Sequence, residues 1–172
     1  GMLVYPAGAE DGDLVVRPTP EGPEDYVLYA RKPRQEQVRY RVTLGPHVAS
    51  VRLVGRTVEL LDSAGVPRLR MSPPTLVDSA CKSFAPRVQV TVCNVESSPR
   101  LPVGKAHVPP GANNCTVHVS WSGMGVTYPA TLDPAWSATG DMITARAGHT
   151  ATKTMADGAP IVLITGGEDA SG

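Results

Sequence analysis

Apolar and polar residues alternate along most of the chain from Tyr26 onward. In the stretch QVRYRVTL every second residue is apolar, namely Val38, Tyr40, Val42 and Leu44. A period of two residues is typical of a strand with one face in a core and the other in water. We therefore predict a half-buried strand over residues 37–44.

Six further segments repeat this pattern, and turn residues such as Gly, Pro and Ser separate most of them. They are VASVRLVG, RTVELLD, VPRLRMS, RVQVTVC, CTVHVSW and VTYPATL. The residues predicted to face inward are Val58, Leu60, Leu69, Met71, Val88, Val90, Val92, Cys115, Val117, Val119, Trp121, Tyr128 and Leu132. The stretch PPTLVDSA is interpreted as a crossing between strands. No segment of similar length has the 3.6-residue period and caps of a helix. These features predict an all-β fold, an antiparallel β-sandwich, because the connections are too short for crossover helices.

Three parts of the chain differ in character. Residues 1–25 are acidic and rich in proline, and we expect an N-terminal arm in which DLVVRP adds at most an edge strand. Residues 26–136 form the predicted sandwich. Residues 137–172 are expected to be a linker and a β-hairpin, because GHTATKTM and IVLITGG flank an Asp-Gly turn.

The charges of the chain balance. Lys and Arg number 16, and Asp and Glu also number 16. This neutrality gives no reason to expect nucleic acid or an anionic membrane as a partner. No apolar run approaches the roughly 20 residues of a membrane span, so membrane insertion is not expected. Several arginines fall on predicted outer faces, either as a basic patch or as ordinary solvated positions: Arg39, Arg41, Arg52, Arg68 and Arg70.

The three cysteines permit one disulfide and one free thiol. Cys93 and Cys115 flank a loop rich in Pro, Gly and Asn, and two strands joined by such a loop could bring them together. We predict a Cys93–Cys115 bridge, which indicates an oxidising compartment, whereas two unpaired buried cysteines are the alternative. Cys81 is then the free thiol.

Catalytic motifs are not found. The sequence has neither a phosphate-binding Gly-rich loop nor a Gly-x-Ser-x-Gly elbow. The four histidines (His47, His107, His118 and His149) are not spaced as metal ligands. We therefore expect no catalytic residue, no cofactor and no metal, and a chain that is not an enzyme.

The last segment resembles the start of a kelch repeat. MITARAGHTAT is followed by an Asp-Gly turn and by IVLITGG, as in bacterial kelch proteins. The resemblance implies structural roles for Arg146, Gly148, His149, Gly166 and Gly167. A kelch blade needs four strands, and only two are present. We therefore expect an N-terminal piece of a longer protein, with a natural short product as the alternative. The unpartnered strand PIVLITG predicts strand exchange between copies, docking on the sandwich, or an exposed edge.

Residues 37–136 resemble the segment that precedes kelch or YD repeats in large secreted bacterial proteins, notably at YPATLDPAW. This resemblance implies a non-enzymatic secreted or cell-surface module for structure, adhesion or interaction. The alternative is an accessory glycan-binding domain of an extracellular galactose-oxidase-like or carbohydrate-active enzyme. Candidate ligand contacts are aromatic, namely Tyr5, Tyr26, Tyr29 and Trp136, and each could instead be ordinary packing. The protein or glycan that it binds is not indicated.

Overall fold

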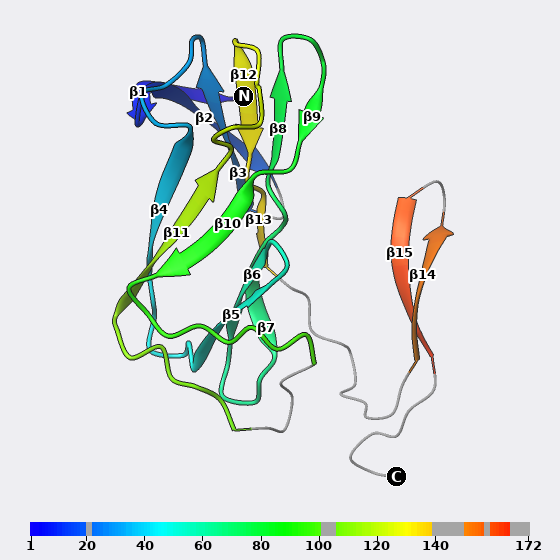
Figure 1. Ribbon diagram of the computed structural model, residues 1–172. Coiled ribbons are helices and arrows are strands. Elements are labelled where there is room, and N and C mark those ends of the chain that lie inside the picture. The colour runs from blue at the N-terminus through cyan, green and yellow to red at the C-terminus, as the bar shows by residue number, and fades with distance from the viewer. Residues whose placement is uncertain (20–21, 101–105, 139–149, 157–158, 166–172) are drawn as a thin grey trace. The chain divides into compact units, whose positions relative to one another are not determined.

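The computed structural model describes residues 1–19, 22–100, 106–138, 150–156 and 159–165. Within these residues the chain is all β and contains no helix, as the alternation predicted (Figure 1). The strands are β1 (Leu3–Ala9), β2 (Gly12–Thr19), β3 (Gly22–Tyr29), β4 (Gln37–Thr43), β5 (Ser50–Val54), β6 (Thr57–Leu61), β7 (Pro67–Met71), β8 (Thr75–Asp78), β9 (Ser83–Phe84), β10 (Arg87–Thr91), β11 (Asn114–Ser120), β12 (Ala130–Asp133), β13 (Trp136–Ala138), β14 (Thr150–Ala156) and β15 (Ala159–Thr165).

The strands form antiparallel sheets. A six-stranded sheet has the order β1-β2-β3-β12-β8-β9, a three-stranded sheet has β10-β11-β4, and a four-stranded sheet has β13-β7-β6-β5. All three belong to one compact unit, Gly1–Thr139. Strand β12 pairs with β3 on one side and with β8 on the other, so long-range contacts join the consecutive strands β1-β2-β3 to the β8-β9 hairpin.

One hydrophobic core receives side chains from all three sheets. The six-stranded sheet contributes Val27, Tyr29, Leu76, Ala130 and Leu132; the three-stranded sheet contributes Val38, Val88, Cys115, Val117 and Val119; the four-stranded sheet contributes Val51, Val58, Leu60 and Met71. Trp121 is fully buried, and its ring centroid lies 5.1 Å from that of Tyr29. Burial of this shared apolar surface makes the three sheets one β-sandwich.

Three local expectations differ from the structure. Most of residues 1–25 form β1, β2 and the first part of β3 rather than an arm, because Leu14 of β2, the cross-strand partner of Val27, packs against the core. The segment interpreted as a crossing contains β8, whose Leu76 is fully buried opposite Leu132. Val92 does not share the inward face of β10, since the strand ends at Thr91 and Val92 is exposed at a φ of 74°.

The hairpin β14–β15 belongs to a second compact unit, Gly140–Gly172. Its strands pair in continuous antiparallel register from Thr150↔Thr165 to Ala156↔Ala159, which leaves Asp157 and Gly158 between them. The predicted strand-turn-strand arrangement is therefore confirmed for the two strands. The exchange of β15 between copies stays a prediction.

Candidate functional site

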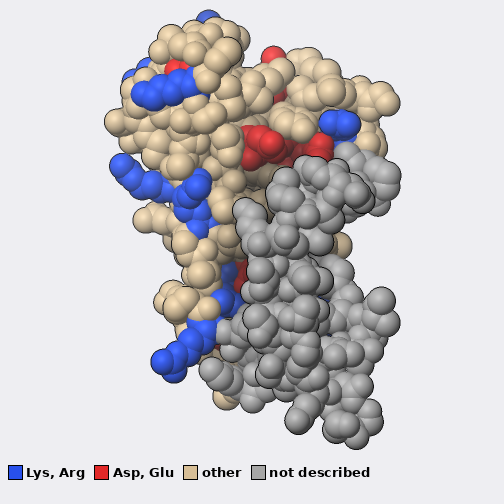
Figure 2. All heavy atoms as spheres, turned by 90° about the vertical axis from the view of Figure 1, so that its right-hand side faces the viewer, with Lys and Arg blue, Asp and Glu red and all other residues tan. Residues whose placement is uncertain are grey.

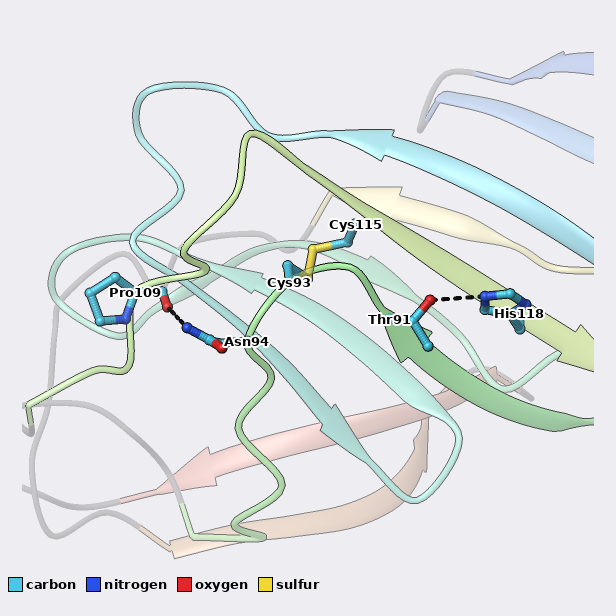
Figure 3. The surroundings of a disulfide bond; sticks show 6 residues. All are labelled: Thr91, Cys93, Asn94, Pro109, Cys115 and His118. Carbon is cyan, nitrogen blue, oxygen red and sulfur yellow. Dashed lines mark hydrogen bonds between the residues drawn. A yellow bond between two sulfur atoms is a disulfide. The ribbon is translucent and has the colours of Figure 1, made fainter.

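A disulfide joins Cys93 to Cys115, as the sequence predicted (Figure 3). The Cα atoms lie 5.2 Å apart, and the bond spans 22 positions of sequence. Next to it, the backbone N–H of Asn94 donates to the carbonyl of Pro110 (2.7 Å), and its side-chain amide donates to that of Pro109 (3.1 Å). The two ends of the long loop between β10 and β11 are thus fastened by one covalent and two hydrogen bonds. Cys81 carries a free, exposed thiol in the turn between β8 and β9.

The same loop closes the edge of the four-stranded sheet. The N–H of Glu96 donates to the carbonyl of Val51 (2.9 Å), and the N–H of Leu53 donates to the carbonyl of Glu96 (2.8 Å). The Glu96 carboxylate accepts from the Ser50 hydroxyl and the Val108 N–H, both at 2.8 Å. Burial acts to raise the pKa of Glu96, but these hydrogen bonds outweigh it and the pKa is lowered. The strand edge of β5 is therefore paired rather than open.

A row of three charges crosses the four-stranded sheet. Arg52 of β5, Glu59 of β6 and Arg70 of β7 are cross-strand partners. Glu59 lies 3.2 Å from Arg52 and 2.6 Å from Arg70. Arg52 also donates to the carbonyls of Ser98 and Pro99. The expected exposed position of Arg52 is wrong, because the loop covers this part of the sheet and both Arg52 and Glu59 are buried.

The other candidate arginines do not form one patch. Arg68 lies 2.6 Å from Asp62, and Arg39 lies 2.8 Å from Glu10. Arg41 is exposed on β4. On the flank shown in Figure 2, the Lys and Arg side chains of the described residues fall into several separate groups, some of them beside acidic side chains. The predicted basic patch therefore divides between two sheets with different surroundings.

The three-stranded sheet has an outer face on which every side chain is polar or charged. Burial alternates along its strands, so that the residues between the core positions point outward. This polar outer face consists of Gln37, Arg39, Arg41 and Thr43 on β4, Asn114, Thr116, His118 and Ser120 on β11, and Arg87, Gln89 and Thr91 on β10. The three strands contain no Asp or Glu, so their own charge is positive in a chain that is neutral overall.

The register places these side chains in rows across the strands. The rows are Gln37–Ser120–Arg87, Arg39–His118–Gln89 and Arg41–Thr116–Thr91. Each row holds one arginine beside two other polar side chains, and successive rows lie about 7 Å apart, the length of two strand residues. The His118 ring is 2.9 Å from the hydroxyl of Thr91 in the next row (Figure 3). The result is a surface on which Arg39 and Arg41 of β4 and Arg87 of β10 stand among neutral hydrogen-bonding groups.

A hollow of about 420 Å³ adjoins the first row, because Gln37 and Ser120 belong to both. Lys32 and Arg34 line its other side. Its one carboxylate, that of Glu36, accepts a hydrogen bond from the Tyr128 hydroxyl (3.1 Å) and lies 3.7 Å from Lys32. The hollow thus extends the cationic character of the outer face beyond the strands.

Lys32 and Arg34 also line a larger hollow, of about 750 Å³, together with Arg31, Asp11 and Asp13. Asp11 accepts from the backbone N–H of Arg34 (2.9 Å) and pairs with the Arg34 guanidinium (3.3 Å). The backbone hydrogen bond from Arg34 is the main cause of the lowered pKa of Asp11. These contacts fix the loop that carries the cations against the turn between β1 and β2.

The aromatic candidates do not share one exposed platform. Tyr29 is fully buried, so the prediction that it contacts a ligand is wrong. Its neighbours in β3 alternate inward and outward, and Tyr29 falls on the core side. The Tyr26 hydroxyl donates to Glu24 (3.0 Å), and Trp136 is half-buried on the core, opposite Met71. Tyr5 is 48% exposed on β1.

The kelch-motif residues lie outside the described residues; they are Arg146, Gly148, His149, Gly166 and Gly167. In the part of the chain that the structure describes, no three His, Cys, Asp or Glu side chains gather as a metal site. Likewise, the described residues contain no helix long and apolar enough to cross a membrane.

The chain matches no protein-family model, no curated protein sequence and no solved structure.

The polar outer face could not be recognised from the sequence alone. Arg39 and Arg41 were visible in the alternation, but Arg87 and His118 belong to distant segments. Six of the seven predicted strands lack Asp and Glu, so composition does not single out these three. The face is recognised only once β4 and β10 are seen to flank β11 in one sheet.

Proposed function

We propose that this chain is a non-enzymatic binding module of an exported or surface-attached protein, and that it meets its partner through the polar outer face. The observation that carries the proposal is the composition of that face: three arginines and a histidine, with no acidic residue in the three strands. An unbalanced charge on one rigid face of a neutral protein attracts an oppositely charged partner and orients it.

The disulfide supports the exported location in this proposal. Disulfides form and persist in oxidising compartments and are rare in the cytosol. The Cys93–Cys115 bond also joins β11, the central strand of the sheet, to the chain just after β10. It therefore stabilises the sheet that carries the binding face. The resemblance of residues 142–167 to a kelch repeat supports a module of the kind found in kelch-repeat proteins.

Chromatography on a sulfonate resin near pH 7 tests the binding face without assuming a partner. A neutral protein with evenly mixed charges elutes early, whereas one with a concentrated cationic face is retarded. We expect retardation of the native protein and its loss in the double variant Arg41→Gln/Arg87→Gln. The matched control is Arg17→Gln/Arg100→Gln, which removes two exposed arginines outside the face and should remain retarded. Early elution of the native protein, or equal losses in both variants, would contradict the proposal.

Intact mass after alkylation of non-reduced protein from its producing cells tests the exported location. We expect one alkylated thiol, that of Cys81, and a blocked pair. Three alkylated thiols would show that the protein resides in a reducing compartment and would remove this part of the proposal.

A further inference from the structure

Resting on the proposed function, we propose further that the partner of the polar outer face is an acidic polysaccharide, a sugar chain that bears carboxylate or sulfate groups. Such a polymer offers anionic groups at regular intervals along its length, and hydroxyl and ring oxygens between them. The outer face offers matching groups, since Arg39 and Arg41 lie two residues apart on β4, Arg87 lies across the sheet on β10, and neutral hydrogen-bonding side chains stand between them.

The arginines suit such a ligand by their chemistry and placement. A guanidinium presents a planar fork of donors that binds a carboxylate or sulfate through two hydrogen bonds. Arg41 and Arg87 are exposed and have no ion pair among the described residues. Arg39 has a competitor, Glu10, at 2.8 Å, but both side chains are about half exposed. A surface pair of this kind contributes little to stability, so an incoming anion can displace the carboxylate.

The neutral side chains complete the site for sugar oxygens. Thr116 stands beside Arg41, Thr91 follows on the next strand of the same row, and Gln89 stands in the row of Arg39. Hydroxyls and amides both donate and accept hydrogen bonds, as do the hydroxyl groups of a sugar. The polar outer face continues past Gln37 and Ser120 into the hollow lined by Lys32 and Arg34. A polymer can therefore contact more cations than the face alone supplies.

The absence of apolar and aromatic side chains among the outward-facing residues of the three strands favours a polysaccharide over a protein or a single-stranded nucleic acid. A protein partner generally requires an apolar centre with a few large anchors, often aromatic. Single-stranded nucleic acid requires aromatic rings on which its bases stack. The outward positions of β4, β10 and β11 hold neither kind of group. A polysaccharide with anionic groups needs only donors and cations.

Titration calorimetry on the oxidised, full 172-residue chain at low ionic strength tests this proposal. The probes are polygalacturonate and heparin, with dextran as the neutral sugar, and polyglutamate and oligothymidylate as polyanions without acidic sugars. We expect binding to polygalacturonate, heparin or both, and none to dextran. Arg41→Gln/Arg87→Gln should weaken binding by about tenfold or more, the loss expected for one or two charge-assisted hydrogen bonds. Arg17→Gln/Arg100→Gln should change it by less than about twofold, with circular dichroism showing that both variants fold.

Three results would overturn the inference. Equal or tighter binding of polyglutamate or oligothymidylate would show a general polyanion surface. Equal weakening by the two double variants would place the site elsewhere. Binding of neither acidic polysaccharide, together with retention on the sulfonate resin, would reject the polysaccharide and leave the proposed binding face standing. If the resin also failed to retain the protein, both proposals would fall.

Discussion

Glu59 holds the guanidinium of Arg52 at 3.2 Å beneath the loop that follows β10, where the two side chains are only 9% and 7% exposed. Removing two charges from water costs several kcal/mol for each ion, and only close contacts recover it. Several contacts offset this desolvation cost. Glu59 also pairs with Arg70, and Arg52 also donates to the loop carbonyls of Ser98 and Pro99. The pair therefore ties the loop to the four-stranded sheet.

Changing Glu59 to Gln should destabilise the protein by about 3 kcal/mol, because it leaves Arg52 buried without a counterion. Urea unfolding measures the loss. The matched control is Arg70→Gln, whose side chain is 43% exposed and whose loss should stay below about 1 kcal/mol. Equal losses in the two variants would show that the burial of Arg52 carries no special cost.

Replacing both disulfide cysteines by Ala should lower the free energy of unfolding by about 3 kcal/mol, since the bond closes a ring of over twenty residues in the unfolded chain. The denaturant midpoint measures this under non-reducing conditions. Cys81→Ala serves as the control, because that thiol is exposed and unbonded, and its midpoint should not move. A stable double variant would mean that the hydrogen bonds of Asn94 fasten the loop by themselves.

Changing Tyr128 to Phe should cost about 1–2 kcal/mol, the penalty for a buried donor that loses its partner. The Tyr128 hydroxyl accepts from the indole N–H of Trp121 (2.8 Å) and donates to Glu36 (3.1 Å). Thermal unfolding, followed by the near-ultraviolet signal of Trp121, measures the change. Tyr26→Phe removes a hydroxyl that bonds only to Glu24 and should have a much smaller effect. A neutral Tyr128→Phe variant would imply that water replaces the hydroxyl.

Asp25→Asn should stabilise the protein in mildly alkaline solution and not in acid. Burial raises the pKa of Asp25 to about 6, while the nearby Tyr40 hydroxyl acts to lower it. A carboxyl whose folded pKa exceeds its unfolded value destabilises the fold when ionised, and this cost disappears as pH falls from above 6 to below 4. The melting temperature of the variant should therefore exceed that of the native protein near pH 8, and the two should converge below pH 4.

Asp62→Asn provides a comparison of opposite sign. The Val66 N–H, the Arg68 side chain and the Ala64 N–H lower the pKa of Asp62. Its ionised form therefore stabilises the fold above its unfolded pKa, and this contribution is lost as pH falls through the lower, folded pKa. The Asp62→Asn variant should melt below the native protein at neutral pH and approach it in acid. The same sign of effect for Asp25 and Asp62 would contradict one of the two assignments.

Much of the sandwich was predictable because a strand's alternation is a local property. The inward positions Val58, Leu60 and Val117 follow directly from a period of two. Glu59 could not be placed in this way. It lies between two inward residues, so the pattern assigns it to water. The loop after β10 covers that face, and no local pattern reports a loop from distant sequence.

Among the candidate site residues, too, local features were predictable and tertiary placement was not. The Cys93–Cys115 bond was predicted from a loop between two strands, and the structure confirms it. Tyr29 was proposed as a ligand contact, but its ring packs against Trp121 in the core. An aromatic residue serves a core as readily as a surface, and only the direction of its strand's inner face decides between the two.

The sequence by itself determined the all-β class, most of the strand positions and the disulfide, because periodicity, turn residues and cysteine spacing act over short stretches of chain. The tertiary structure decided which strands are neighbours. That choice placed Arg87 and His118 in the same sheet as Arg39 and Arg41, and it buried Arg52 under a distant loop. Strand pairing depends on the burial of one shared core by the whole chain, so a surface assembled across strands exists only after that burial is complete.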